Sequence, residues 1–178
     1  MMPWILSDIV SLAQYVATFS MKEFDKKRCL HCGKLGLWRH GHYPRKADRS
    51  SVSDESLNPI LIQRYYCPSC CQTSSVLPEC IPPKRWYLWD AQQEALLLLL
   101  VGKSLNATAK EITPSRHTIK RWLTRLKERF LLHKDVLCNY FIELGRTVNY
   151  IDFWQAFFKT HLLSAAMRLC HVAGVLIP

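Results

Sequence analysis

CLHCG at residues 29–33 and CPSC at residues 67–70 are the two stretches that decide the fold of the first half of this 178-residue chain. A Cys-x-x-Cys turn places two thiolates on one side of a tight loop, and two such turns face to face form a tetrahedral four-sulfur site. Gly33 can adopt the positive φ that such a turn often requires. We therefore predict one structural zinc ion, bound by Cys29, Cys32, Cys67 and Cys70.

The segment between the two cysteine pairs has the composition of a β-hairpin with an insertion. Leu35–His40 and Ile60–Tyr66 are strand candidates, and the second leads directly into Cys67. The polar stretch Arg45–Asn58 between them is typical of an inserted loop. This order of turn, strand, loop, strand and turn predicts a zinc ribbon.

The remaining thiols and the nearby histidines leave alternatives open. A redox role would suit one Cys-x-x-Cys beside a βαβ unit, and four cysteines close the shell that a catalytic zinc would need open. His40 and His42 are interpreted as surface histidines and Cys71 as a thiol outside the site, with replacement of a ligand by one of them as the alternative. The other three cysteines have no partner at ligand spacing and are interpreted as small core residues: Cys80, Cys138 and Cys170.

Residues 86–134 have the pattern of three helices. A first helix ends at Gly102, and a short second helix follows a cap at Ser104 or Asn106. Thr113-Pro114 forces a turn, after which Ser115 can cap a third helix. The apolar stripe of that helix comprises Ile119, Trp122, Leu123, Leu126 and Phe130.

The opposite side of the third helix is basic. A short helix, a tight turn and a capped helix with basic outer positions are how a helix-turn-helix presents its second helix to the major groove. Nine of the chain's 24 Lys and Arg residues lie between Gly102 and Lys134, against two acidic residues. The residues predicted to contact DNA are Ser115, Arg116, His117, Lys120, Arg121, Thr124 and Arg125.

The two ends of the chain are predicted to be helical. Residues 1–25 place Ile5, Ile9, Leu12, Val16 and Phe19 at three- and four-residue steps. Residues 135–178 form an apolar tail, with helical spacing from Leu162 to Val172. Such a tail can pack against the first helix or bind a partner, and its end is compatible with a truncated reading frame.

A family resemblance covers residues 27–130. The cysteine pairs, WRHGHY at residues 38–43 and RYYCPSC at residues 64–70 resemble the zinc ribbon of insertion-element transposases. The run from Ser104 to Leu123 resembles the helix-turn-helix of bacterial transposases and resolvase-type proteins, and the link at residues 76–87 resembles a transposase-associated bacterial family with both modules in this order. The resemblance implies DNA binding in a mobile-element context.

A complete transposase also needs a nuclease domain with well-separated carboxylates. After Phe130 the only acids are Asp135, Glu143 and Asp152, so we predict a non-catalytic protein or a remnant of a transposase. The stretch Tyr150–Trp154 is interpreted as a packing segment, with the first strand of a degenerate nuclease as the alternative.

The predicted architecture is α+β and mainly α. An N-terminal helix (1–25) precedes a zinc ribbon (26–82), a helix-turn-helix (86–134) and a helical tail (135–178). The net charge of +10 favours a polyanionic partner, so we expect duplex DNA, with a homodimer or a transposase as further partners. The alternative is a ribbon that binds protein or RNA, or a transcriptional regulator without a role in transposition.

The longest apolar run, Ala95–Val101, is far shorter than a membrane span, and no secretion signal is visible. We therefore expect a bacterial cytoplasmic protein that is associated with the nucleoid when bound to DNA, with no membrane partner.

Overall fold

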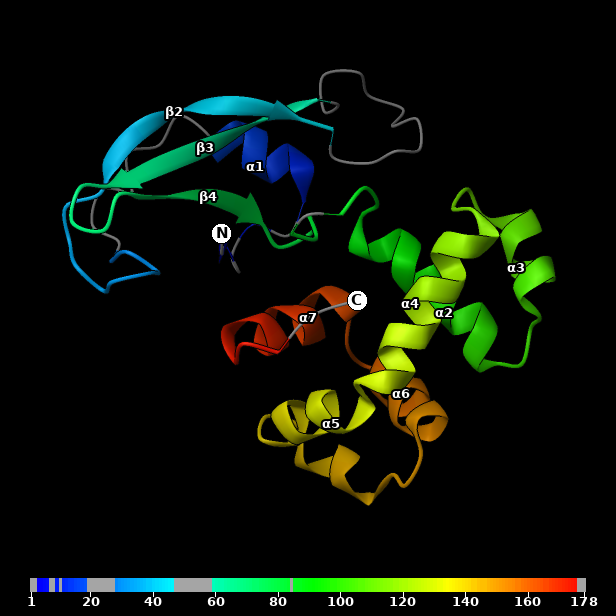
Figure 1. Ribbon diagram of the computed structural model, residues 1–178. Helices are drawn as coiled ribbons and strands as arrows, with labels where there is room; N and C mark the ends of the chain where they lie inside the picture. The colour runs from blue at the N-terminus through cyan, green and yellow to red at the C-terminus, as the bar shows by residue number, and fades with distance from the viewer. Residues whose placement is uncertain are drawn as a thin grey trace. The chain divides into compact units, whose positions relative to one another are not determined.

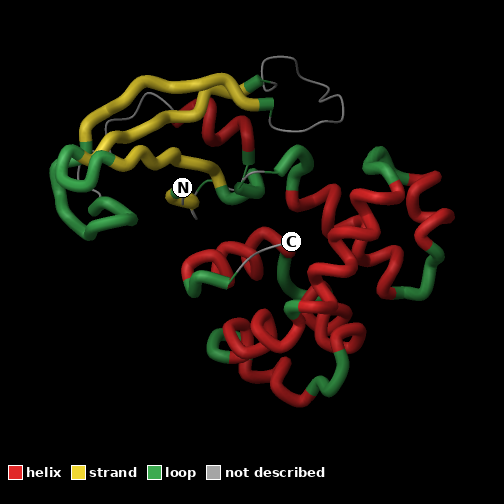
Figure 2. The backbone as a smooth tube through the Cα atoms, viewed as in Figure 1, coloured by secondary structure: helices red, strands yellow, loops and turns green. Residues whose placement is uncertain are grey.

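The computed structural model describes residues 3–6, 9, 11–18, 28–46, 59–83 and 85–175 and has an α+β fold. The chain divides into two compact units, Met1–Leu88 and Trp89–Pro178. All described strands lie in the first unit, and the described regular structure of the second is entirely helical (Figure 2).

The first unit is built on a four-stranded sheet in the order β1-β4-β3-β2 (Figure 1). Strand β1 pairs in parallel with β4, whereas β4 with β3 and β3 with β2 are antiparallel. The elements are β1 (Trp4–Leu6), α1 (Leu12–Thr18), β2 (Trp38–Arg45), β3 (Ile60–Cys67) and β4 (Gln72–Pro78).

Helix α1 is anchored to this sheet by Tyr15. The Tyr15 hydroxyl donates to the backbone oxygen of Val76 at 3.2 Å and accepts from the backbone N–H of Gln63 at 3.4 Å. Burial raises the pKa of Tyr15 to about 12. These bonds satisfy the one polar side chain that α1 buries.

The predicted helix over residues 1–25 is confirmed at Leu12–Thr18 and wrong at Trp4–Leu6. Trp4–Leu6 is a strand that buries Trp4 and Leu6, and Trp4 meets the ring of Tyr65 edge-on at 6.0 Å. Among the described residues the helix spans Leu12–Thr18, and a reciprocal capping box between Ser11 and Gln14 starts it. Pairing with β4 outweighs the local helical spacing, while Phe19 and residues 20–25 lie outside the described residues.

The strands around the two cysteine pairs differ from the predicted hairpin in two ways. Strand β2 begins at Trp38 rather than Leu35 and continues to Arg45, with a bulge between Arg39 and His42 where Gly41 has a φ of +67°. Residues 72–78 form a strand, β4, that the hairpin prediction did not include, and its last three residues belong to the link at residues 76–87. Residues 47–58 of the predicted loop lie outside the described residues.

The second unit packs its helices around an aromatic and aliphatic core. The most deeply buried large side chains include Leu96 on α2 and Trp154 on α6. The helices are α2 (Trp89–Leu100), α3 (Leu105–Glu111), α4 (Arg116–Glu128), α5 (Phe130–Cys138), the 3-10 helix η3 (Ile142–Arg146), α6 (Tyr150–Phe158) and α7 (Leu163–Val172).

Residues of the predicted tail contribute to this core. Helices α6 and α7 both pack on α2, and α7 also packs on α5. The Gln155 side chain donates to the backbone oxygen of Leu100 at 2.8 Å, and Gln93 accepts from the backbone N–H of Leu163 at 2.6 Å. In both cases a side chain of one helix thus forms a hydrogen bond with a backbone group at the end of another helix. Tyr150–Trp154 is helical, so the packing interpretation is confirmed and the strand alternative is wrong.

Local signals define α3 and α4. Gly102, at φ +94°, follows α2, and Ser104 and Ser115 cap the next two helices as predicted. Helix α4 ends at Glu128 and not at Phe130, because Arg129 leaves the helical region and α5 begins at the following residue.

Replacing Ser115 by alanine is expected to lower the free energy of unfolding by about 1 kcal/mol, because the N–H of Thr118 loses its side-chain acceptor. Thermal or urea unfolding of the full chain measures this change. Ser115→Asp restores an acceptor and is expected to unfold close to the wild type. An alanine variant as stable as the wild type would show that the cap contributes nothing.

Candidate metal centre and basic helix

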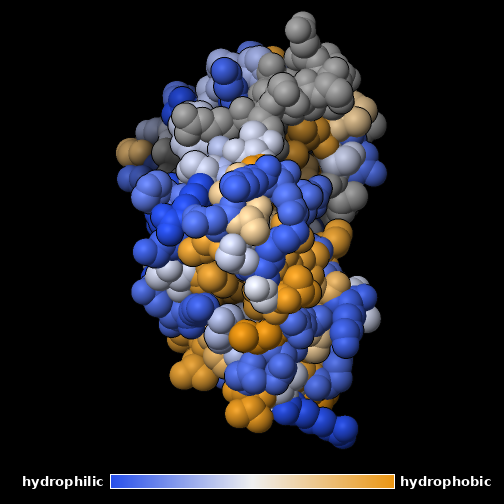
Figure 3. All heavy atoms as spheres, turned by 90° about the vertical axis from the view of Figure 1, so that its right-hand side faces the viewer, coloured by the Kyte–Doolittle hydropathy of each residue, from blue (hydrophilic) through white to orange (hydrophobic). Residues whose placement is uncertain are grey.

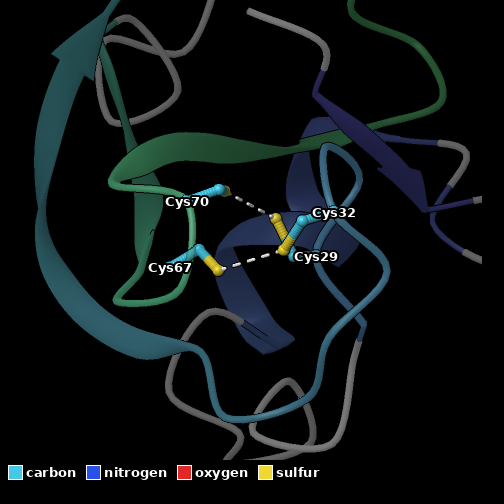
Figure 4. A group of neighbouring side chains, drawn as sticks. All are labelled: Cys29, Cys32, Cys67 and Cys70. Atoms are coloured by element: carbon cyan, nitrogen blue, oxygen red, sulfur yellow. Dashed lines mark hydrogen bonds between the residues drawn. The ribbon is translucent and has the colours of Figure 1, made fainter.

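The four predicted cysteine ligands meet at one end of the sheet. Cys29 and Cys32 precede β2, whereas Cys67 and Cys70 form the turn between β3 and β4, and the four side chains point toward one another (Figure 4). Their sulfurs all lie within 4.8 Å of one another, with 3.6 Å between those of Cys29 and Cys70 and between those of Cys32 and Cys67.

These distances fit a metal ion better than a disulfide. Sulfurs around a tetrahedral ion at a Zn–S distance of ~2.3 Å are about 3.8 Å apart, whereas a disulfide bond is ~2.05 Å long. All four cysteines are free thiols. They can therefore bind one metal ion together.

Each Cys-x-x-Cys turn is called a knuckle here, and the two knuckles have the same backbone geometry. The N–H of Gly33 donates to the backbone oxygen of Cys29 at 2.9 Å, and the N–H of Cys71 donates to that of Cys67 at 2.8 Å. Both donors have positive φ, +71° for Gly33 as predicted and +57° for Cys71. Cys71 is exposed and thus shapes the second turn from outside the cluster. Its position four residues after Cys67, matching Gly33 after Cys29, is the sequence signal for this role.

The electrostatics of the cluster favour a cation. Burial tends to raise the pKa of the Cys67 thiol, but hydrogen bonds from the backbone N–H groups of Cys70 and Ser69 lower it to about 6. Burial raises the pKa of Cys70 to about 12. Thiols this close cannot all ionise on their own, because each thiolate repels the next. A divalent cation between them removes that penalty.

The other candidate ligands lie apart from the cluster. His40 and His42 are exposed on β2, as interpreted from the sequence. Cys80 and Cys170 are buried, as predicted, and Cys138 is half-buried. In the described part of the chain, the four-cysteine cluster is the one group of three or more His, Cys, Asp or Glu side chains close enough to share a metal ion.

Helix α4 separates an apolar side from a basic side. Ile119, Trp122 and Leu126 are buried at 0–4% exposure, which confirms that Trp122 is a core residue. Six of the seven residues predicted to contact DNA are exposed and the seventh, Arg125, is half-buried. The structure thus places all seven at the start of α4 or on its outward side.

The charge on this side of α4 is not neutralised within the described structure. Among the described residues, no acidic side chain forms an ion pair with the basic side chains Arg116, Lys120, Arg121 and Arg125. The acidic residue of α3, Glu111, is paired with Lys103 at 2.5 Å. A shallow groove of about 220 Å³ is lined by Lys120, Arg121, Thr124, Arg125 and Glu128. In Figure 3, which shows the side at the right of Figure 1, hydrophilic residues cover much of the surface between separate hydrophobic areas.

Among the helices that the structure describes, none combines the length and the apolar character that a membrane span needs.

Comparison with known proteins identifies one family. No curated protein and no solved structure matches the chain. Residues 29–122, just over half of the chain, match the family described as a domain of unknown function, DUF6431. The match starts at the first cysteine of the cluster and ends within α4, so it spans the candidate metal centre and the helices up to the basic one. The chain therefore belongs to the DUF6431 family.

Proposed function

We propose that this protein binds duplex DNA through a helix-turn-helix formed by α3 and α4. In the sequence it follows a zinc ribbon formed by β2, β3, β4 and the four cysteines, with α2 between the two modules. The observation that carries the proposal is the row of basic side chains on the outward side of α4, opposite its buried stripe, none of which forms an ion pair with a described acidic residue.

Zinc is the metal that suits the cluster best. Four thiolates are soft ligands, and tetrahedral four-sulfur sites are typical of Zn²⁺ or iron–sulfur centres. Two matched Cys-x-x-Cys knuckles flanking antiparallel strands are characteristic of zinc ribbons. A closed four-cysteine shell makes the proposed role of the metal structural.

The spacing of α3 and α4 suits the DNA-binding role. Helix α3 ends at Glu111 and α4 begins at Arg116, so four residues form the turn, the length usual for a helix-turn-helix. In that motif the N-terminal residues of the second helix contact base edges. Here those residues include Arg116 and Lys120, and the side chains of Arg and Lys bind phosphates or guanine.

The resemblance to insertion-element transposases extends the proposal to its biological setting. We propose a non-catalytic role in a mobile-element context, as an accessory protein, a repressor or the DNA-binding part of a transposase. A homodimer or a transposase would supply the second half-site contact, and the site of action would be the bacterial nucleoid.

Duplex binding and metal content, measured on one purified sample of the full chain, test the proposal. We expect one zinc per chain and binding that weakens about 100-fold between about 50 and 200 mM salt, since four phosphate contacts give a slope near −3.6. Zinc-loaded protein that binds no duplex would refute DNA binding. Tighter binding to single-stranded or hairpin RNA than to the duplex would favour an RNA-binding ribbon instead.

A further inference from the structure

Three rings lie together at the edge of the sheet in the first unit. Trp38 and His40 come from β2 and Tyr66 from β3; the Trp38 and Tyr66 rings are 6.3 Å apart and tilted by 49°, and those of His40 and Tyr66 are 5.7 Å apart and tilted by 36°. Trp38 is 62% exposed. We call these three residues the ring cluster.

Strand β2, which contributes two of the three rings, is exposed to solvent in this region. It is the outermost strand of the sheet on its side, and the five residues from Trp38 to His42 are all exposed. Successive side chains of a strand point to opposite faces, so both faces of this part of β2 meet solvent. The rings are therefore available to a ligand and are not used to build the core.

The surroundings of the ring cluster are basic. Arg64 precedes Tyr66 by two residues on β3, which places both on one face of the strand, and Arg39 follows Trp38 on the other face of β2. The described residues of this unit include seven Lys or Arg but a single carboxylate, Glu79, which is 7% exposed. Exposed rings beside arginine side chains fit a polyanion that also offers flat aromatic faces.

We propose that the ring cluster is a second DNA-binding surface, which stacks the unpaired bases of single-stranded DNA. Exposed rings beside basic side chains are how proteins bind single strands: the bases stack on the rings and the phosphates lie against the charges. In a duplex the faces of the bases are stacked inside the helix, so the rings of the cluster cannot stack on them. The choice of DNA over RNA rests on the proposed function.

Binding of the zinc-loaded full chain to a labelled single-stranded thymidine oligomer of about twelve nucleotides tests the proposal. We expect Trp38→Ala to weaken this binding at least about fivefold, because a base loses its stacking partner. Trp38→Phe keeps a ring and is expected to retain most of the affinity. Because Trp38 is largely exposed, both variants are expected to fold. Their zinc content and unfolding temperature check this.

The matched control is Trp86→Ala, because Trp86 is also 62% exposed in the same unit but lies in the segment after β4. We expect it to bind the oligomer as the wild type does. An abasic oligomer has the same phosphates and no bases, so it is expected to bind the wild type more weakly and to be insensitive to Trp38→Ala.

Three results would overturn the proposal: unchanged binding of the thymidine oligomer by Trp38→Ala, equal affinity of the wild type for the abasic oligomer, or tighter binding of the wild type to a uridine RNA oligomer of the same length. The test is separable from that of the proposed function. We expect Trp38→Ala to leave duplex affinity unchanged, and loss of duplex binding with retained stacking would remove only the role of α4.

Discussion

Replacing Cys67 by serine is expected to release the metal and unfold the first unit. Zinc bound by four thiolates contributes on the order of 10 kcal/mol to folding. That is comparable to the entire stability of an ordinary domain, which is about 5–15 kcal/mol. Cys67 is fully buried and joins the end of β3 to the second knuckle, so no other described thiol can take its place. Metal analysis of the purified variant and its far-UV circular dichroism measure both effects.

The matched control is Cys71→Ser, the same chemical change at an exposed thiol four residues away. Its sulfur lies outside the cluster, so we expect a full complement of zinc and a nearly unchanged unfolding temperature. Chelation of zinc from the wild type is expected to reproduce the Cys67→Ser phenotype. Stoichiometric zinc in a stable Cys67→Ser protein would refute the four-cysteine site.

The double variant Arg116→Ala/Lys120→Ala is expected to lose about 10- to 100-fold in duplex affinity at low salt. Each removed phosphate contact also reduces the slope of log affinity against log salt by about 0.9, so the slope falls by about 1.8. Both side chains are exposed and lie opposite the buried stripe of α4, so the fold is expected to survive. Fluorescence anisotropy with a labelled duplex at several salt concentrations measures both quantities.

Arg146→Ala/Lys159→Ala removes the same two charges from η3 and from the residue after α6, where both side chains are exposed. We expect this control to change duplex affinity only slightly, through the net charge. Equal losses in the two double variants would mean that α4 is not the DNA-binding surface and that the affinity reflects bulk charge alone.

The candidate metal centre could be predicted from the sequence because each knuckle is local. Cys29 and Cys32 share one turn, as do Cys67 and Cys70, so their spacing alone places two sulfurs on one side of the backbone. Only the meeting of the two turns needs tertiary structure. The left-handed conformation of Cys71 escaped prediction because a non-glycine residue rarely adopts it.

The end of α2 and the starts of α3 and α4 were also readable locally. Ser104 and Ser115 cap helices through hydrogen bonds to residues three positions away, and Gly102 adopts a positive φ after α2. The residue types at these positions are therefore enough to predict the boundaries. The N-terminal strand was not readable in this way. Its apolar residues satisfy a helical spacing, and their pairing partner, β4, is about 70 residues away in the chain.

The sequence by itself determined the features that depend on neighbours along the chain: the two cysteine knuckles, the helix caps and the two-sided character of α4. The tertiary structure alone decided that β1 and β4 join β2 and β3 in one sheet, that α6 and α7 pack on α2, and that Trp38, His40 and Tyr66 lie together at an edge. The reason is physical: caps and turns are stabilised by bonds within a few residues, whereas strand pairing and core packing depend on which distant surfaces can bury one another.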